Sequence, residues 1–266
     1  MLRVLLSGGN RGIGYYMVLQ FLQKGYKVAV LDLKLDHISG LKEKYGENLL
    51  LLECDISNPI AVAECVSKTA SVFGGIDYAV QNACKYMFAS LEDTTDEDFR
   101  SVYNVNFFGA VNLARAVLPI MLEQASGRIV YTCSSASITG YLYNDAYAPS
   151  KGAVESLAKC LNIEYMKRGV TFHVMHPPLT GTESIETLSV RDGFKVDPAK
   201  VGVGLANNIH KRNFIICHSL LQYIWIKILC LFPIKFGIAA SNMILRSAGY
   251  GSRELIKYKS AKKTGG

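Results

Sequence analysis

The sequence lacks several features that mark common classes of protein. Its seven cysteines form no Cys-x-x-Cys pair and are odd in number, so we expect reduced, mostly buried thiols rather than a disulfide framework. No histidine and cysteine spacing typical of a metal site is present, and no metal is expected. Internal repeats, low-complexity segments and a signal-like start are also missing, which favours a cytoplasmic globular protein.

Acidic residues are scarce after position 190. That part of the sequence holds 13 lysines and arginines but 3 acids, whereas the earlier part holds 16 basic and 19 acidic residues. Such a basic end is typical of contact with an anionic membrane surface, or of a solvated lysine-rich tail. We expect no nucleic-acid partner.

Apolar runs alternate with helix-like segments along most of the chain. The strand-like runs are LRVLLSG, KVAVLDL, NLLLLECD, IDYAVQN, GRIVYTCSS, VTFHVMHP and NFIICHS. Helical patterns cover 11–24, a polar stretch ending at Tyr45, 58–73, 96–124, 146–167 and 198–210. Because the strand-like runs are continuously apolar, both faces should be buried, as in a parallel sheet covered by helices.

This alternation predicts an α/β fold with a doubly wound, Rossmann-type parallel sheet, which binds ligands at the carboxyl ends of its strands. No linker rich in proline or glycine interrupts the first 218 residues. We therefore expect one domain over residues 1–218 and an apolar, then basic, helical extension over 219–266.

A glycine-rich turn, SGGNRGIG, follows the first strand-like run. Gly8 would permit a tight bend, and Gly12 and Gly14 would let the backbone approach a pyrophosphate at the start of a helix. The spacing differs from the commoner G-x-G-x-x-G. Its position after the first strand nevertheless favours dinucleotide binding.

Two carboxylates are expected at the adenosine end of that site. Asp32 ends the second strand-like run, where it would accept hydrogen bonds from a ribose diol and repel a 2′-phosphate. This favours NAD over NADP, although Arg11 argues weakly for a phosphate. Asp55, after the third run, is the candidate for the adenine edge.

Tyr147 and Lys151 lie four residues apart in YAPSK, on one face of a predicted helix. An ammonium close to a phenol favours the phenolate and should lower the pKa of Tyr147. Ser134 lies at the end of an earlier strand and could bond a substrate oxygen. Tyr141 and Tyr143 either line a substrate pocket or cap a loop.

The sequence resembles the classical short-chain dehydrogenase/reductase family over about residues 1–218. SGGNRGIG resembles the family's TGxxxGIG, QNAC its NNAG, NVNFFG the segment with its asparagine, and HPPLTGT its PGxxxT. Gln81, Cys84 and Pro178 depart from these patterns. Asn106, Ser134, Tyr147 and Lys151 match the family's catalytic residues in order and spacing.

The resemblance implies a role for each of these residues. Tyr147 would be the general acid or base, Lys151 would lower its pKa and hold the nicotinamide ribose, Ser134 would position the carbonyl, and Asn106 would support a water relay. The implied cofactor-binding residues are Gly8, Asn10, Arg11, Gly12, Ile13, Gly14, Asp32, Asp55, Ile56, Asn82, Ala83, Tyr147, Lys151, Pro177 and Thr182. A homodimer or homotetramer built through the two long helices is also expected.

The substrate is expected to be a lipophilic secondary alcohol or ketone. HPPLTGTE and the apolar C-terminal segment weakly resemble 3-ketosphinganine reductases, and the layout resembles membrane-bound steroid and retinol dehydrogenases. Substrate selection is also expected in the loop 183–197. The alternative is a non-catalytic dinucleotide-binding or scaffold protein that has kept the fold.

The segment LLQYIWIKILCLFPIKFGIAA, residues 220–240, is apolar and contains no acidic residue. Its length suits a membrane span, but Lys227, Pro233 and Lys235 argue against one. We expect two short helices, 220–231 and 234–245, hinged at Pro233. They would contact a membrane peripherally, or pack on the domain or a partner subunit and cover the substrate cleft.

Overall fold

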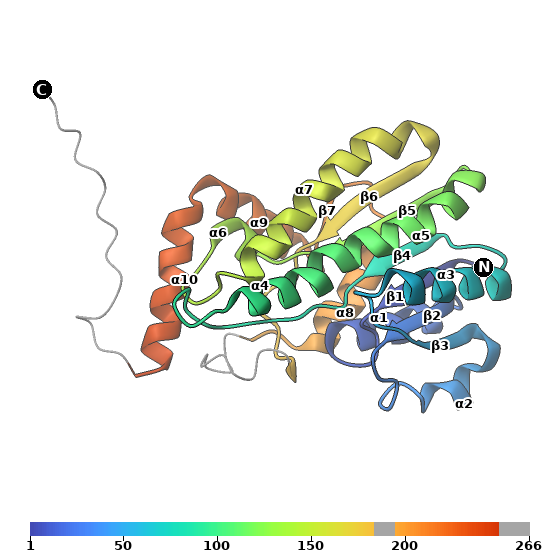
Figure 1. Ribbon diagram of the computed structural model, residues 1–266, viewed down its shortest axis with the longest axis horizontal. Coiled ribbons are helices and arrows are strands. Elements are labelled where there is room, and N and C mark those ends of the chain that lie inside the picture. The colour runs from blue at the N-terminus through green and yellow to red at the C-terminus, as the bar shows by residue number, and fades with distance from the viewer. Residues whose placement is uncertain (184–194, 250–266) are drawn as a thin grey trace, which may run out of the picture.

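The computed structural model describes residues 1–183 and 195–249 of the chain. Its strands form one sheet in the order β3-β2-β1-β4-β5-β6-β7, and every neighbouring pair is parallel. The strands are β1 (Arg3–Ser7), β2 (Lys27–Asp32), β3 (Leu49–Glu53), β4 (Tyr78–Gln81), β5 (Gly127–Thr132), β6 (Val170–Met175) and β7 (Ile215–Ile216). The predicted doubly wound sheet is confirmed (Figure 1).

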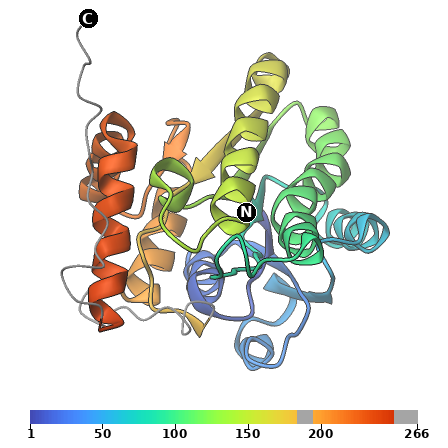
Figure 2. The same cartoon turned by 60° about the vertical axis from the view of Figure 1, so that its left-hand side comes forward.

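Helices cover both faces of this sheet (Figures 1 and 2). One face packs against α3 (Pro59–Phe73), α5 (Gly109–Glu123) and α7 (Tyr147–Tyr165), and the other against α1 (Gly12–Gln23) and α8 (Pro198–Asn208). The remaining α-helices of the described residues are α2 (Leu41–Tyr45), α4 (Asp96–Tyr103), α6 (Ala136–Thr139), α9 (Leu220–Leu231) and α10 (Pro233–Ser247).

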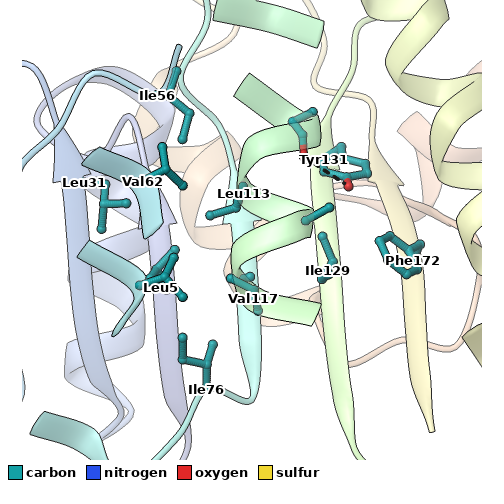
Figure 3. Packing of buried hydrophobic residues seen from close by; sticks show 14 of the residues in the cluster. Leu5, Leu31, Ile56, Val62, Ile76, Leu113, Val117, Ile129, Tyr131 and Phe172 are labelled. Carbon is teal, nitrogen blue, oxygen red and sulfur yellow. Dashed lines mark hydrogen bonds between the residues drawn. The ribbon is translucent and has the colours of Figure 1, made fainter. Parts of the chain in front are cut away.

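The core explains why the strand sequences are continuously apolar. Leu5, Leu31 and Ile129 project to one face and meet Val62 of α3 and Leu113 of α5 (Figure 3). The alternate residues of the same strands join the second cluster on the face of α1 and α8. Each strand thus buries both sets of side chains, as a parallel sheet requires.

Two predicted elements are shorter than their sequence patterns. The polar stretch before Tyr45 forms only the five residues of α2, because the backbone N–H groups of His37 and Ile38 donate to Asn10 Oδ1 instead. The last strand, β7, has two residues at the edge of the sheet. After it, Ser219 caps α9 by accepting a hydrogen bond from Gln222 N.

The apolar segment after Ser219 forms two helices, α9 and α10, as predicted. They meet at Phe232 with a bend of 110° and lie at one end of the molecule beside α6 (Figures 1 and 2). A Cβ on Gly237 would lie 2.5 Å from Thr139 O, so only glycine permits this approach. Ser241 Oγ accepts a hydrogen bond from Leu142 N at 3.1 Å, which fixes α10 to the loop after α6.

Within the described residues, one helical segment, Asp96–Glu123, is long and apolar enough to cross a membrane. Most of it is α5, which packs against α3 and the sheet, and core helices meet the same criterion. The helices α9 and α10 meet it only as a bent pair. Residues 184–194 of the expected substrate loop and the basic end 250–266 lie outside the described residues, and the expected oligomer stays a prediction.

Candidate active site

The glycine-rich turn joins β1 to α1 through close contacts that leave no space for a side chain at Gly8 or Gly14. Gly8 has a φ of 71°, and a Cβ there would lie 2.5 Å from Ala83 N. A Cβ on Gly14 would lie 1.9 Å from Gly8 O. Gly14 therefore packs the first turn of α1 under Gly8 and does not line the cavity described below, which is lined by Gly8 and Gly12.

A chain of hydrogen bonds connects this turn to α7. Asn82 Nδ2 donates to Gly8 O at 2.8 Å, and Thr132 Oγ1 donates to Asn82 Oδ1 at 3.1 Å. Lys151 Nζ, which is fully buried, donates to Thr132 O at 2.7 Å. The ends of β1, β4 and β5 are thereby tied to the helix that carries Tyr147 and Lys151.

A cavity of about 1000 Å³ runs along the carboxyl ends of these strands to α9 and α10. It brings together most of the residues predicted from the sequence. Those that line it are Gly8, Asn10, Arg11, Gly12, Ile13, Asp32, Asp55, Ile56, Asn82, Ala83, Ser134, Tyr147, Lys151, Pro177 and Thr182. Its glycine-lined end, where Gly12 faces Thr182, suits the close approach of a dinucleotide.

Charged groups concentrate at the end of the cavity near β2. Asn10 N donates to Asp32 Oδ2 at 2.9 Å. Asn10 Nδ2 and Arg11 both donate to Asp36, and these bonds lower the pKa of Asp36 to about 2. Arg11 also forms an ion pair with Glu183 at 2.7 Å. Arg11 therefore forms ion pairs with two carboxylates, Asp36 and Glu183. The side chain of Lys34 lines the same end of the cavity.

Tyr147 begins α7, and Lys151 lies one turn later on the same face. Lys151 Nζ is 5.8 Å from the centre of the Tyr147 ring. Burial raises the pKa of Tyr147 well above its ordinary value, and the nearby Ser134 hydroxyl opposes this shift. The structure thus differs from the expected lowering of the pKa, because the loss of solvation dominates and the ammonium points to Thr132 O.

Asn106 does not line the cavity. It lies fully buried in a π-helical turn, Asn104–Phe108, between α4 and α5. Its Oδ1 accepts from Lys85 N at 2.8 Å, and its Nδ2 donates to Lys85 O at 3.0 Å and Ser150 Oγ at 2.9 Å. Single π-helical turns often mark functional sites, and this one attaches the loop after β4 to α7.

Of the residues at the other half of the cavity, the sequence indicated only Tyr141 individually; Tyr143, the second tyrosine considered, does not line the cavity. That half is mainly apolar and lies around α9 and α10. Its lining residues include Tyr86, Val105, Tyr141, Leu179, Trp225, Leu229, Phe236, Ala239, Ala240, Met243 and Ile244. The apolar run after Ser219 was the available signal, but which of its faces turns inward depends on the bend at Phe232.

A family model described as short chain dehydrogenase matches residues 3–192. The chain belongs to the short-chain dehydrogenase/reductase family. Members of this family are NAD(P)-dependent oxidoreductases, and the glycine-lined cavity fits such a cofactor. Gly8, Gly12 and Asn82 line the end that would hold its phosphates.

Similar proteins include retinol dehydrogenase 8 from Homo sapiens, which is 32% identical over 187 residues. That match covers 68% of this chain and 59% of the human protein. A vibriobactin-specific 2,3-dihydro-2,3-dihydroxybenzoate dehydrogenase from Vibrio cholerae is 32% identical over 184 residues, covering 68% of this chain and 70% of that protein. The chain therefore spans less than two thirds of the human relative.

The fold is also similar to a short-chain dehydrogenase from Streptomyces avermitilis, with a TM-score of 0.76 at 19% sequence identity. That likeness covers 94% of this chain and 100% of the other. At this identity the likeness shows the fold alone.

We predict that Gly14→Ala lowers the free energy of unfolding by about 1–3 kcal/mol, because the new Cβ overlaps Gly8 O and the turn must open. It should also weaken NADH binding. Gly152→Ala on α7 is the control, since a Cβ there meets nothing within 4 Å and alanine favours a helix. Urea unfolding and NADH fluorescence titration measure both effects. Equal stability of the two variants would contradict the prediction.

Proposed function

We propose that this protein transfers a hydride between NAD(P) and the secondary alcohol or ketone carbon of a lipophilic substrate. The observation that carries the proposal is one cavity that joins Ser134, Tyr147 and Lys151 to the apolar wall of α9 and α10. The polar groups suit carbonyl chemistry, and the wall suits an apolar molecule.

The proposed mechanism assigns one task to each polar group. Ser134, which is close enough to Tyr147 to affect the pKa of the phenol, would hold the substrate oxygen beside it. Because burial keeps Tyr147 protonated, it is prepared to donate its proton to that oxygen during reduction and to receive it back during oxidation. Bound NAD(P) supplies or accepts the hydride.

Lys151 would act through its charge and its position. Thr132 O holds the buried ammonium on the same helical face as Tyr147, from where it stabilises a developing phenolate. Asn106 is hydrogen-bonded to Lys85 and Ser150. It would hold α7 in position on the side away from the cavity and support the relay of a proton through water.

Tyr147→Phe should lower the rate of ketone reduction by about 10² to 10⁴ because the proton donor is lost. NADH binding should persist, since the ring remains. Tyr165→Phe, at the far end of the same helix, is the control. Stopped-flow oxidation of NADH with long-chain ketones gives the rates, and fluorescence titration gives the binding. Unchanged reduction would contradict the assigned role; cofactor binding without any reduction in the unmodified protein would favour the scaffold alternative.

The charges near β2 support NAD rather than NADP as the preferred cofactor. Asn10 N holds the Asp32 carboxylate in place, where it would repel a 2′-phosphate. Arg11, the residue that argued for a phosphate, forms ion pairs with Asp36 and Glu183. Lys34 lines the same end of the cavity. Its positive charge would attract a 2′-phosphate, which reduces the preference for NAD over NADP without removing it.

Asp32→Ala should lower the preference for NADH over NADPH by about fivefold or more, since two like charges about 4 Å apart in water repel by about 1 kcal/mol. The ratio of kcat/KM for the two cofactors measures this. Glu43→Ala, an exposed carboxylate on α2, should leave the ratio unchanged. Our assignment would be wrong if the unmodified protein preferred NADPH.

We further propose that the outer face of α9 and α10 contacts an anionic membrane surface. Leu220, Leu221 and Leu231 are each 69–80% exposed, and Trp225 is 45% exposed while also lining the cavity. Residues 220–249 contain no acid, and Lys227 and Lys235 lie over the rings of Tyr223 and Phe232. Exposed apolar groups, interfacial tryptophan and lysines that extend to headgroups suit a peripheral contact.

Leu221→Gln combined with Leu231→Gln should reduce binding to vesicles of phosphatidylserine and phosphatidylcholine by about tenfold, because it removes exposed apolar area from that face. Ile60→Gln on α3, also 70% exposed, should have no effect. Vesicle sedimentation measures the binding. A full-length protein that binds no vesicles would contradict this location.

A further inference from the structure

Two tyrosine hydroxyl groups face each other in the apolar half of the cavity. Tyr86 follows β4 and Tyr141 follows α6, and their hydroxyl oxygens are 3.4 Å apart. The Tyr86 ring also meets the Tyr147 ring edge to face, with centres 4.9 Å apart. The pair therefore lies directly beside the proposed proton donor, and both residues line the cavity.

The surroundings of this pair are apolar. Tyr141 packs against Ile244 of α10, and Met243 and Leu179 pack against the same residue. Burial raises the pKa of Tyr86 far above its ordinary value and raises that of Tyr141 as well. Both groups therefore keep their protons at neutral pH, and each can donate one hydrogen bond.

The pair has more hydrogen-bonding capacity than its own contact uses. One hydroxyl donates to the other, which leaves the proton of the second without an assigned acceptor. The separation of 3.4 Å is longer than the usual 2.7–2.8 Å, so even the bond between them is weak. A ligand oxygen placed between the two hydroxyl groups could accept a hydrogen bond from each of them. Both bonds could then be shorter than the present contact between the tyrosines.

Asn144 adds to this surplus. Its side chain is 2% exposed and close enough to Tyr141 to affect the pKa of that hydroxyl. Yet neither Oδ1 nor Nδ2 of Asn144 has a partner at hydrogen-bond geometry in the described part of the chain. Buried polar groups are normally hydrogen-bonded. Tyr86, Tyr141 and Asn144 therefore all have hydrogen-bonding capacity that a ligand could use.

We propose that Tyr86 and Tyr141 bind a second oxygen of the substrate, with Asn144 supporting Tyr141. The substrate class is then an apolar molecule that carries a hydroxyl or carbonyl oxygen a few bonds from the carbon that reacts at Tyr147. This inference rests on the proposed function and narrows it, because a plain hydrocarbon ketone would leave the tyrosine pair without a partner.

The test compares a long-chain dialkyl ketone with derivatives that carry one hydroxyl group on the first, second or third carbon from the carbonyl. For the unmodified protein with NADH, one of these positional isomers should have a kcat/KM about tenfold above the parent ketone. A well-placed hydrogen bond in a water-excluded site produces a preference of this size. The gain should be found mainly in KM.

Tyr86→Phe and Tyr141→Phe should each bring the ratio of kcat/KM for the preferred isomer to that of the parent ketone close to one. Both variants keep the aromatic ring, so any purely structural packing by the ring is retained. Tyr143→Phe is the matched control: it removes a neighbouring tyrosine hydroxyl outside the cavity lining and should retain the preference. A merely structural role of the pair would lower kcat for every ketone equally and leave the preference unchanged.

The outcomes separate this inference from the proposed function. If the unmodified protein reduces the parent ketone but no isomer is preferred, or if the preference survives both substitutions, the second oxygen site is wrong and the reaction stands. If the protein reduces none of the ketones although it binds NADH, the proposed reaction fails and the second site with it.

Discussion

The hydrogen bond from the buried Lys151 ammonium to Thr132 O is the contact on which the site depends. A charge that is fully buried is costly unless hydrogen bonds hold it, and the carbonyl at the end of β5 satisfies this need. Thr132 in turn bonds Asn82, and Asn82 bonds Gly8. The spacing between the glycine-rich turn and Tyr147 is therefore fixed by side-chain and backbone hydrogen bonds at adjacent strand ends.

Local patterns were enough to predict most of the fold and the polar half of the site. The continuous apolar runs indicated the strands. Asn58, the first residue of the helical pattern 58–73, caps α3 by accepting a hydrogen bond from Ile60 N. The helix break at Pro233 was predicted because proline in a helix interior removes a backbone hydrogen bond and clashes with the preceding turn. Ser134, Tyr147 and Lys151 were found because their spacing is fixed by one strand end and one helix face.

What could not be predicted depends on contacts between distant segments. Tyr86 and Tyr141 are 55 residues apart in the sequence, and neither lies in a motif that marks the other. The direction of the Tyr147 pKa shift depends on how far the folded chain removes the phenol from water. The short α2 results from Asn10, whose side chain takes the backbone donors of His37 and Ile38.

The attachment of α10 has a consequence for how this fold can diversify. Gly237 and Ser241 fasten the helix to the loop after α6, whereas Ala239, Ala240 and Met243 line the cavity. None of the bonds that align Lys151, Thr132 and Asn82 passes through this helix. Exchanges at these inward positions would change the apolar wall of the cavity and leave the hydrogen bonds of its polar half in place, so α10 could be replaced without loss of the arrangement proposed for hydride transfer.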